Sequence, residues 1–140
     1  MNSAATADTG EDASRFDSAR VVERFWELMR DNDFVAVGSV LADDFVCEWP
    51  QSGELIRGRD SFASVNAEYP AHGLWEFEVR ELVADGGTVV TDTVITDGVV
   101  KARAISFFTV TGGAIVRLRE YWPDDYEAPG NRADLVERLA

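Results

Sequence analysis

One glutamate stands out among the residues that could do chemistry, because its side of a predicted strand is otherwise free of charge. Strict alternation along residues 114–122 puts one set of side chains on the same side: Ala114, Val116, Leu118, Glu120 and Trp122. A carboxyl group buried there is costly unless it is paired, hydrogen-bonded or protonated, and desolvation raises its pKa. Such a group suits general acid or base catalysis. Alternatively, Glu120 lies near the end of the strand and reaches water or a nearby arginine.

Aromatic and small polar residues on the same predicted interior could surround a ligand. Trp49 and Trp122 could form aromatic walls, although aromatic residues in amphipathic strands also serve simply as core. Cys47 lies two residues from Trp49 on the same face and is expected to be an inert buried thiol. The hydroxyl groups of Thr93 and Ser106 face the same interior, where they either meet a ligand or bond to the backbone.

His72 is the single histidine of the chain and lies in a predicted loop, three residues after Tyr69. It is either a catalytic partner for Glu120 or an ordinary surface residue. One histidine and one cysteine exclude a multi-histidine or cysteine zinc site. The acidic pairs 43–44 and 124–125 fall at predicted element boundaries, where aspartate caps helices or forms turns. With no glycine-rich phosphate loop before a helix and no nucleophile-elbow serine, we expect neither a metal nor a cofactor.

The composition restricts the partners and the compartment. Acidic residues outnumber basic ones by 26 to 13, which gives a net charge of -13 and argues against binding nucleic acid or an anionic membrane. The single cysteine forbids an intrachain disulfide and favours a reducing cytoplasm. No stretch approaches the roughly 20 apolar residues of a membrane span. Residues 1–14 lack the features of a signal peptide and are predicted to be a disordered tail.

The remaining residues, 15–140, are predicted to form one domain with a C-terminal extension from about residue 124. Apolar spacing of three and four predicts helices, and runs of β-branched and aromatic residues predict strands. Glycine pairs and Asp-Gly steps separate the later strands as tight hairpin turns. The predicted helices cover residues 14–30, 33–41, 60–69 and 132–139, and the predicted strands cover residues 45–49, 54–57, 75–84, 88–96, 99–111 and 114–122.

This order of elements predicts an α+β fold in which the helices cover one face of an antiparallel sheet. The opposite, outer face combines Ile105, Phe107 and Tyr121 with Arg103, Arg117 and Arg119. Such a mixed apolar and basic surface is expected to face solvent or a second copy of the chain in a homodimer.

Four segments resemble the SnoaL-like, polyketide-cyclase branch of the NTF2-like superfamily. They are Val22-Glu23-Arg24-Phe25-Trp26-Glu27-Leu28, Leu41-Ala42-Asp43-Asp44-Phe45-Val46, Ile56-Arg57-Gly58-Arg59-Asp60 and Arg119-Glu120-Tyr121-Trp122-Pro123. The resemblance spans roughly residues 15–125 and implies a cone-shaped fold, with a curved antiparallel sheet wrapped over three N-terminal helices. It also implies a cofactor-free pocket for an apolar small molecule, although this fold hosts many reactions.

The characterised branches of this superfamily place different residues in the pocket. Where ketosteroid isomerases have a Tyr and two Asp, this chain is expected to have Phe25, Trp49 and Ser106. Where limonene-epoxide-hydrolase-like enzymes have an Arg and two Asp, the matching residues are Thr93, Ile95 and Glu120. The resemblance therefore adds Ile95 to the expected pocket and argues against both standard reactions. Scytalone-dehydratase-like enzymes need two histidines, and this chain has one.

The phenazine-pathway isomerase branch also has an Arg-Glu-aromatic run in its last strand, and that Glu is an acid catalyst. Its histidine partner corresponds to Val65 here, seven residues before His72. The resemblance thus implies an enzyme that moves a proton by isomerisation, cyclisation, dehydration or hydrolysis, with Glu120 as acid or base and Cys47, Trp49, Tyr69 and Trp122 shaping the pocket. A protein that binds its ligand without converting it, or a dimeric assembly module, remains the alternative.

Overall fold

The computed structural model describes the backbone of residues 3–139 and the side chains of residues 17–139. In chain order the elements are α1 Ser3–Arg30, α2 Phe34–Val37, the 3-10 helix η1 Gly38–Val40, β1 Leu41–Trp49, β2 Glu54–Arg57, α3 Arg59–Glu68, β3 Glu76–Asp85, β4 Thr88–Thr96, β5 Lys101–Thr111, β6 Ala114–Tyr121 and the 3-10 helix η2 Gly130–Arg132. Helices α1 and α2 come first, the strands β1 and β2 precede α3, and the other four strands follow it.

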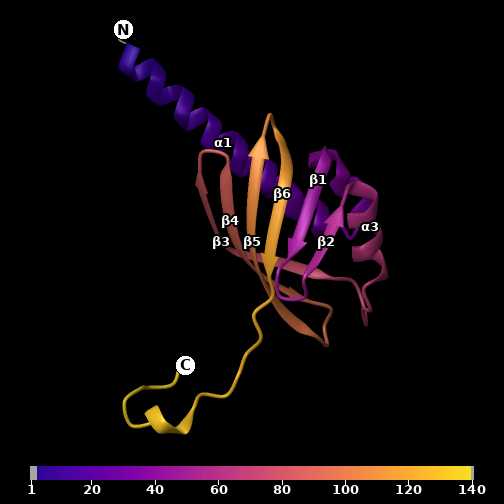
Figure 1. Cartoon of the computed structure of the whole chain (residues 1–140), viewed down its shortest axis with the longest axis vertical. Helices are drawn as coiled ribbons and strands as arrows, with labels where there is room; N and C mark the ends of the chain where they lie inside the picture. The colour runs from indigo at the N-terminus through magenta and orange to yellow at the C-terminus, as the bar shows by residue number, and fades with distance from the viewer. Residues whose placement is uncertain (1–2, 140) are drawn as a thin grey trace.

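The six strands form one curved, open sheet in the order β2-β1-β6-β5-β4-β3. All neighbouring pairs are antiparallel except β1 and β6, which run parallel. Figure 1 shows α1 crossing one face of the sheet, with α3 beside β1 and β2. This α+β architecture is the predicted one, with the difference that the parallel β1–β6 pair makes the sheet mixed. No helix within residues 3–139 is long and apolar enough to cross a membrane.

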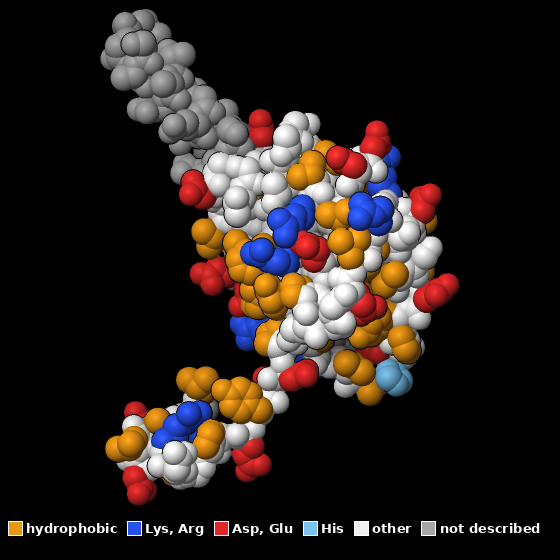
Figure 2. Space-filling model, in the orientation of Figure 1, with side chains coloured by type: hydrophobic (Ala, Val, Ile, Leu, Met, Phe, Trp, Pro, Cys, Tyr) orange, Lys and Arg blue, Asp and Glu red, His pale blue; other side chains and the backbone are white. Residues whose placement is uncertain are grey.

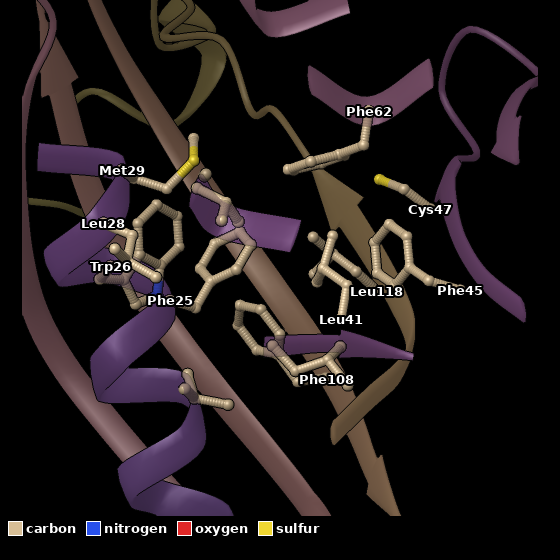
Figure 3. Packing of buried hydrophobic residues seen from close by; sticks show 14 of the residues in the cluster. Phe25, Trp26, Leu28, Met29, Leu41, Phe45, Cys47, Phe62, Phe108 and Leu118 are labelled. Carbon is tan, nitrogen blue, oxygen red and sulfur yellow. The ribbon is translucent and has the colours of Figure 1, made fainter. Parts of the chain in front are cut away.

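Aromatic rings fill the space between α1 and the inner face of the sheet (Figure 3). Phe25 and Trp26 of α1 are buried, and Phe108 of β5 packs against both, with its ring centroid 5.1 Å from Phe25 and 6.2 Å from Trp26. Phe62 of α3 closes the other side against Phe45 of β1 at 5.4 Å. Edge-to-face contacts of this kind add to the free energy of burial, so this cluster fixes α1 and α3 on the sheet.

The predicted meander is confirmed, with boundaries that agree to within about two residues, the usual scatter of strand ends. Elsewhere the elements differ in extent. β1 is longer than predicted and begins at Leu41, and the predicted helix over residues 33–41 is divided into α2 and η1. The predicted helix over residues 132–139 is wrong: only the short turn η2 forms, and the segment leaves the sheet with nearly all of its side chains exposed, so no packing stabilises a helix there.

Helix α1 begins at Ser3, well before the expected start at residue 14. Because the side chains of residues 1–16 lie outside the described part, the division into a tail over residues 1–14 and one domain over residues 15–140 stays a prediction.

The predicted alternation along β6 is wrong in its first half. Ile115 is fully buried, whereas Ala114 and Val116 are only partly buried. The register explains the change: Thr109 pairs with Arg117 but Val110 pairs with Ile115, so Val116 is an extra residue in a β-bulge. The extra residue moves the side chains before it on β6 to the opposite face from the predicted one, whereas Leu118 and Glu120 point inward as predicted.

The ring cluster predicts a large stability effect. Phe108→Ala is expected to lower the free energy of unfolding by about 3–5 kcal/mol, since it removes a buried ring that cannot be replaced by collapse of its neighbours. Chemical denaturation measures the loss. Leu135→Ala is the control, because Leu135 is 84% exposed and its truncation should change stability by less than about 0.5 kcal/mol. Equal effects for the two variants would contradict this account of the core.

Candidate functional site

The carboxyl group of Glu120 is buried, with only 5% of the residue exposed, as its position on the inner face predicts. Two side chains donate hydrogen bonds to it. Ser106 Oγ donates to Oε2 at 2.7 Å, and Trp49 Nε1 donates to Oε1 at 3.1 Å. No arginine or lysine forms an ion pair with Glu120 in the part of the chain whose side chains are described. The expectation that it might reach a nearby arginine is therefore not met.

Three strands bring these groups together. Ser106 lies directly opposite Glu120 in the antiparallel β5–β6 pair, so both side chains point to the same face. Trp49 comes from β1, which runs parallel to β6 with Glu48 beside Arg119. The next residue on each strand points to the opposite face, so Trp49 and Glu120 are neighbours on the inner face.

Burial raises the pKa of the Glu120 carboxyl above its ordinary value, and the hydrogen bonds from Ser106 and Trp49 oppose this rise. The two donors satisfy both oxygens but neither carries a full charge. A neutral carboxylic acid is therefore favoured over a wider range of pH than on the surface.

The thiol of Cys47 lies on the same strand face as Trp49 and is completely buried. Burial raises its pKa far above the ordinary value, and the negative charges of Glu120 and Glu48 add to the effect. The thiolate form is thus suppressed, which agrees with the predicted inert role.

The other interior residues predicted for the pocket lie on the inner face of β4. Thr93 is fully buried, and its Oγ1 has no hydrogen-bond partner among the residues whose side chains are described. Ile95, two residues along, is packed into the hydrophobic core. A buried hydroxyl without a partner is costly, and Thr93 lines none of the described cavities.

Trp49 and Trp122 meet at the end of the sheet where β1 turns into β2 and β6 ends. Their ring centroids are 6.1 Å apart and the rings are nearly perpendicular. Together with Tyr69, which is 59% exposed, they line a cavity of about 350 Å³. Glu120 lies behind Trp49 and is not itself among the residues that line this cavity.

His72 is held by Asp97 and makes no described contact with Glu120. Both the backbone N–H of His72 and its Nδ1 lie 2.9 Å from Oδ2 of Asp97, and Oδ1 accepts from the backbone N–H groups of Val99 and Val100. The hydrogen bond from the backbone N–H of His72 contributes most to holding the pKa of the Asp97 carboxyl well below its usual range. Burial acts in the opposite direction.

Sequence reasoning placed Asp97 only in a hairpin turn. An aspartate that precedes glycine in a turn commonly bonds to backbone N–H groups further along, and that signal accounts for the contacts with Val99 and Val100. The contact with His72 spans 25 residues and has no local signature. Within the described residues, no group of three or more His, Cys, Asp or Glu is arranged to hold a metal ion.

Comparison with known proteins agrees with this architecture. Residues 22–118 match the SnoaL-like domain family, and this match covers more than half of the chain. The protein therefore belongs to the SnoaL-like domain family and has the NTF2-like fold. No protein of curated function matches it.

Three solved structures show the likeness in detail. A candidate ketosteroid isomerase from Kribbella flavida DSM 17836 is 29% identical, with a TM-score of 0.84 over 91% of this chain and 93% of its own. An NTF2-like protein of unknown function from Burkholderia xenovorans LB400 is also 29% identical, with a TM-score of 0.75 over 90% and 98%. An LEH-like epoxide hydrolase from M. tuberculosis is 26% identical, with a TM-score of 0.64 over 78% and 84%.

The raised pKa of Glu120 predicts a pH dependence of stability. As the pH rises above about 4.3, the unfolded chain loses its Glu120 proton before the folded chain does, so the folded state loses stability until the pH exceeds the raised pKa. Glu120→Gln cannot ionise at this position. Its stability relative to the natural protein should therefore increase over this range, by about 1.4 kcal/mol for each pH unit between the unfolded and folded pKa values of Glu120. Urea denaturation at pH 4 and pH 8 measures the difference, and a constant difference would contradict the assigned shift.

Proposed function

We propose that this protein binds an apolar small molecule inside the curved sheet and that Glu120 transfers a proton during its conversion. The observation that carries the proposal is a buried carboxyl with a raised pKa, held by two neutral donors and by no ion pair among the described residues. Isomerisation, cyclisation, dehydration and hydrolysis all fit one acid–base group. No step of such a reaction requires a cofactor, and the proposed location is the cytoplasm.

Membership of a family with isomerase-like, cyclase-like and epoxide-hydrolase-like relatives supports an enzyme of this general kind. The residues that the resemblance matched to ketosteroid isomerase acids have other tasks here. Phe25 belongs to the core, and Trp49 and Ser106 donate to Glu120. The proposed reaction therefore depends on a carboxyl group from the last strand. Thr93, with its buried and unpartnered hydroxyl, would hold a polar atom of the ligand.

The alternative function is binding without conversion. Two observations favour it: Glu120 is separated from the nearest described cavity by Trp49, and His72 bonds to Asp97 instead of to Glu120. In that case Glu120 would only orient the indole of Trp49.

We also propose that the outer face of the sheet joins two copies of the chain. Figure 2 shows apolar and basic side chains intermixed on this face. Phe107 and Tyr121 pack with ring centroids 6.1 Å apart, and the Arg119 guanidinium lies 5.0 Å from the Phe107 ring centre. Arg119 Nε is buried and has no partner among the described residues, so an acceptor from a second copy would satisfy it.

Catalysis by Glu120 is tested by Glu120→Gln, which keeps the size of the side chain and an acceptor oxygen for Trp49. We expect the variant to fold and to lose at least about 100-fold in kcat on a substrate found by screening cyclic ketones, enones and epoxides. Glu48→Gln is the matched control, because Glu48 pairs with Arg117 on the outer face and its loss should leave kcat unchanged. Turnover of Glu120→Gln within threefold of the natural protein would favour the binding alternative.

The dimer is tested by Phe107→Glu, which places a charge in the centre of the proposed interface. Sedimentation velocity at micromolar concentration should show a dimer for the natural protein and a monomer for the variant. A natural protein that sediments as a monomer would contradict the proposed interface.

A further inference from the structure

The cavity beside Trp49 and Trp122 has walls of an unusual composition. Three aromatic side chains line it, from Trp49, Tyr69 and Trp122. The two indole rings stand at 87° to each other, so they form a corner and not a flat stack. Aromatic faces attract a positive charge through their quadrupole, and rings arranged around a corner can contact such a charge from more than one side.

The charged groups around the same cavity are all acidic. Glu54 and Asp124 line it, and no lysine or arginine does. Glu54 lies directly opposite Trp49 in the β1–β2 pair, which puts its carboxylate on the same face as the indole. Neither carboxylate forms an ion pair with a described residue. The cavity therefore has two negative charges, neither of which is held in a described ion pair.

The aromatic corner is held in place by hydrogen bonds. The Gln51 carboxamide bonds to both backbone groups of Trp122: its Oε1 accepts from the N–H, and its Nε2 donates to the carbonyl oxygen at 3.3 Å. Trp49 is fixed through its Nε1 by Glu120 at 3.1 Å. A site positioned in this way loses less entropy when a ligand binds.

A second cavity shares Tyr69, Trp122 and Asp124 with the first and has a mixed lining. It adds Arg80, Lys101 and Arg103 together with a further acid, Asp125. Lysine and arginine side chains therefore line the second cavity but not the aromatic one, where both charged groups are acidic. The net charge of -13 further raises the local concentration of cations around the protein.

We propose that the cavity lined by Trp49, Tyr69, Trp122, Glu54 and Asp124 binds the ammonium group of a small organic cation. Aromatic walls suit a diffuse, weakly hydrated charge such as a methylated ammonium. They do not suit Ca²⁺ or Mg²⁺, which take about six or more oxygen ligands, because aromatic walls supply none. The proposal rests on the proposed function only in taking the protein to bind a small molecule, and it does not require Glu120 to transfer a proton.

Choline and its neutral carbon isostere 3,3-dimethylbutan-1-ol provide the test, because they have nearly the same shape and differ in charge. Isothermal titration calorimetry on the full chain should show binding of choline, with the isostere at least about tenfold weaker. Trp122→Ala should weaken choline binding by about 2- to 30-fold, and Glu54→Gln should weaken it while leaving the isostere unchanged. Tyr126→Ala is the matched control, since Tyr126 is exposed on the C-terminal segment and does not line the cavity.

Equal affinity for choline and the isostere, no heat with choline, or an equal effect of Trp122→Ala and Tyr126→Ala would each overturn the proposal. Glu120→Gln separates this proposal from the proposed function, because the glutamine oxygen still accepts from Trp49 and choline binding should persist. If the protein binds choline but Glu120→Gln turns over as fast as the natural protein, the acid–base role of Glu120 is rejected and the cation site stands. If Glu120→Gln loses turnover but the natural protein does not bind choline, the cation site is rejected and the acid–base role of Glu120 stands.

Discussion

A carboxyl group removed from water must find donors, and the interior of this protein is arranged around that requirement at Glu120. Burial alone would make the ionised form very costly. The protein supplies a hydroxyl from Ser106 and an indole N–H from Trp49, both neutral, so the group is satisfied without being fixed as an anion. An arginine in the same place would have kept the carboxylate charged and unsuited to give up a proton. The choice of neutral donors is what makes the site chemically interesting.

The parallel pairing of β1 with β6 is the feature of the fold that makes this possible. It brings Trp49 from the first hairpin to the end of the last strand, where the indole contacts Glu120 on one side and Trp122 on the other. The same tryptophan therefore belongs to the buried carboxyl site and to the aromatic cavity. A change in the orientation of the Trp49 ring would therefore alter both the hydrogen bonding of Glu120 and the shape of the aromatic cavity.

Local patterns predicted a large part of this architecture. Glycine-containing turns marked the meander, and alternation on β6 correctly predicted that Glu120 points inward. Alternation could not reveal the bulge at Val116, because an extra residue leaves no trace in the apolar pattern. The contacts of Glu120 with Trp49 and of His72 with Asp97 depend on how distant segments pair. Such contacts become visible only once the order of the strands is known, and neither residue spacing nor the family resemblance predicted the parallel β1–β6 pair.

The distance in sequence between Trp49 and Glu120 has a consequence for how the protein is made. The two residues are separated by 71 positions, and Glu120 belongs to the last strand of the sheet. During synthesis the β1–β2 hairpin leaves the ribosome long before β6 has been made. One edge of β1 therefore stays unpaired until β6 is available. The pocket is accordingly among the last parts of the molecule to form. A chain that stops short of β6 would lack Glu120 and also the strand that joins β1 to β5 in the sheet.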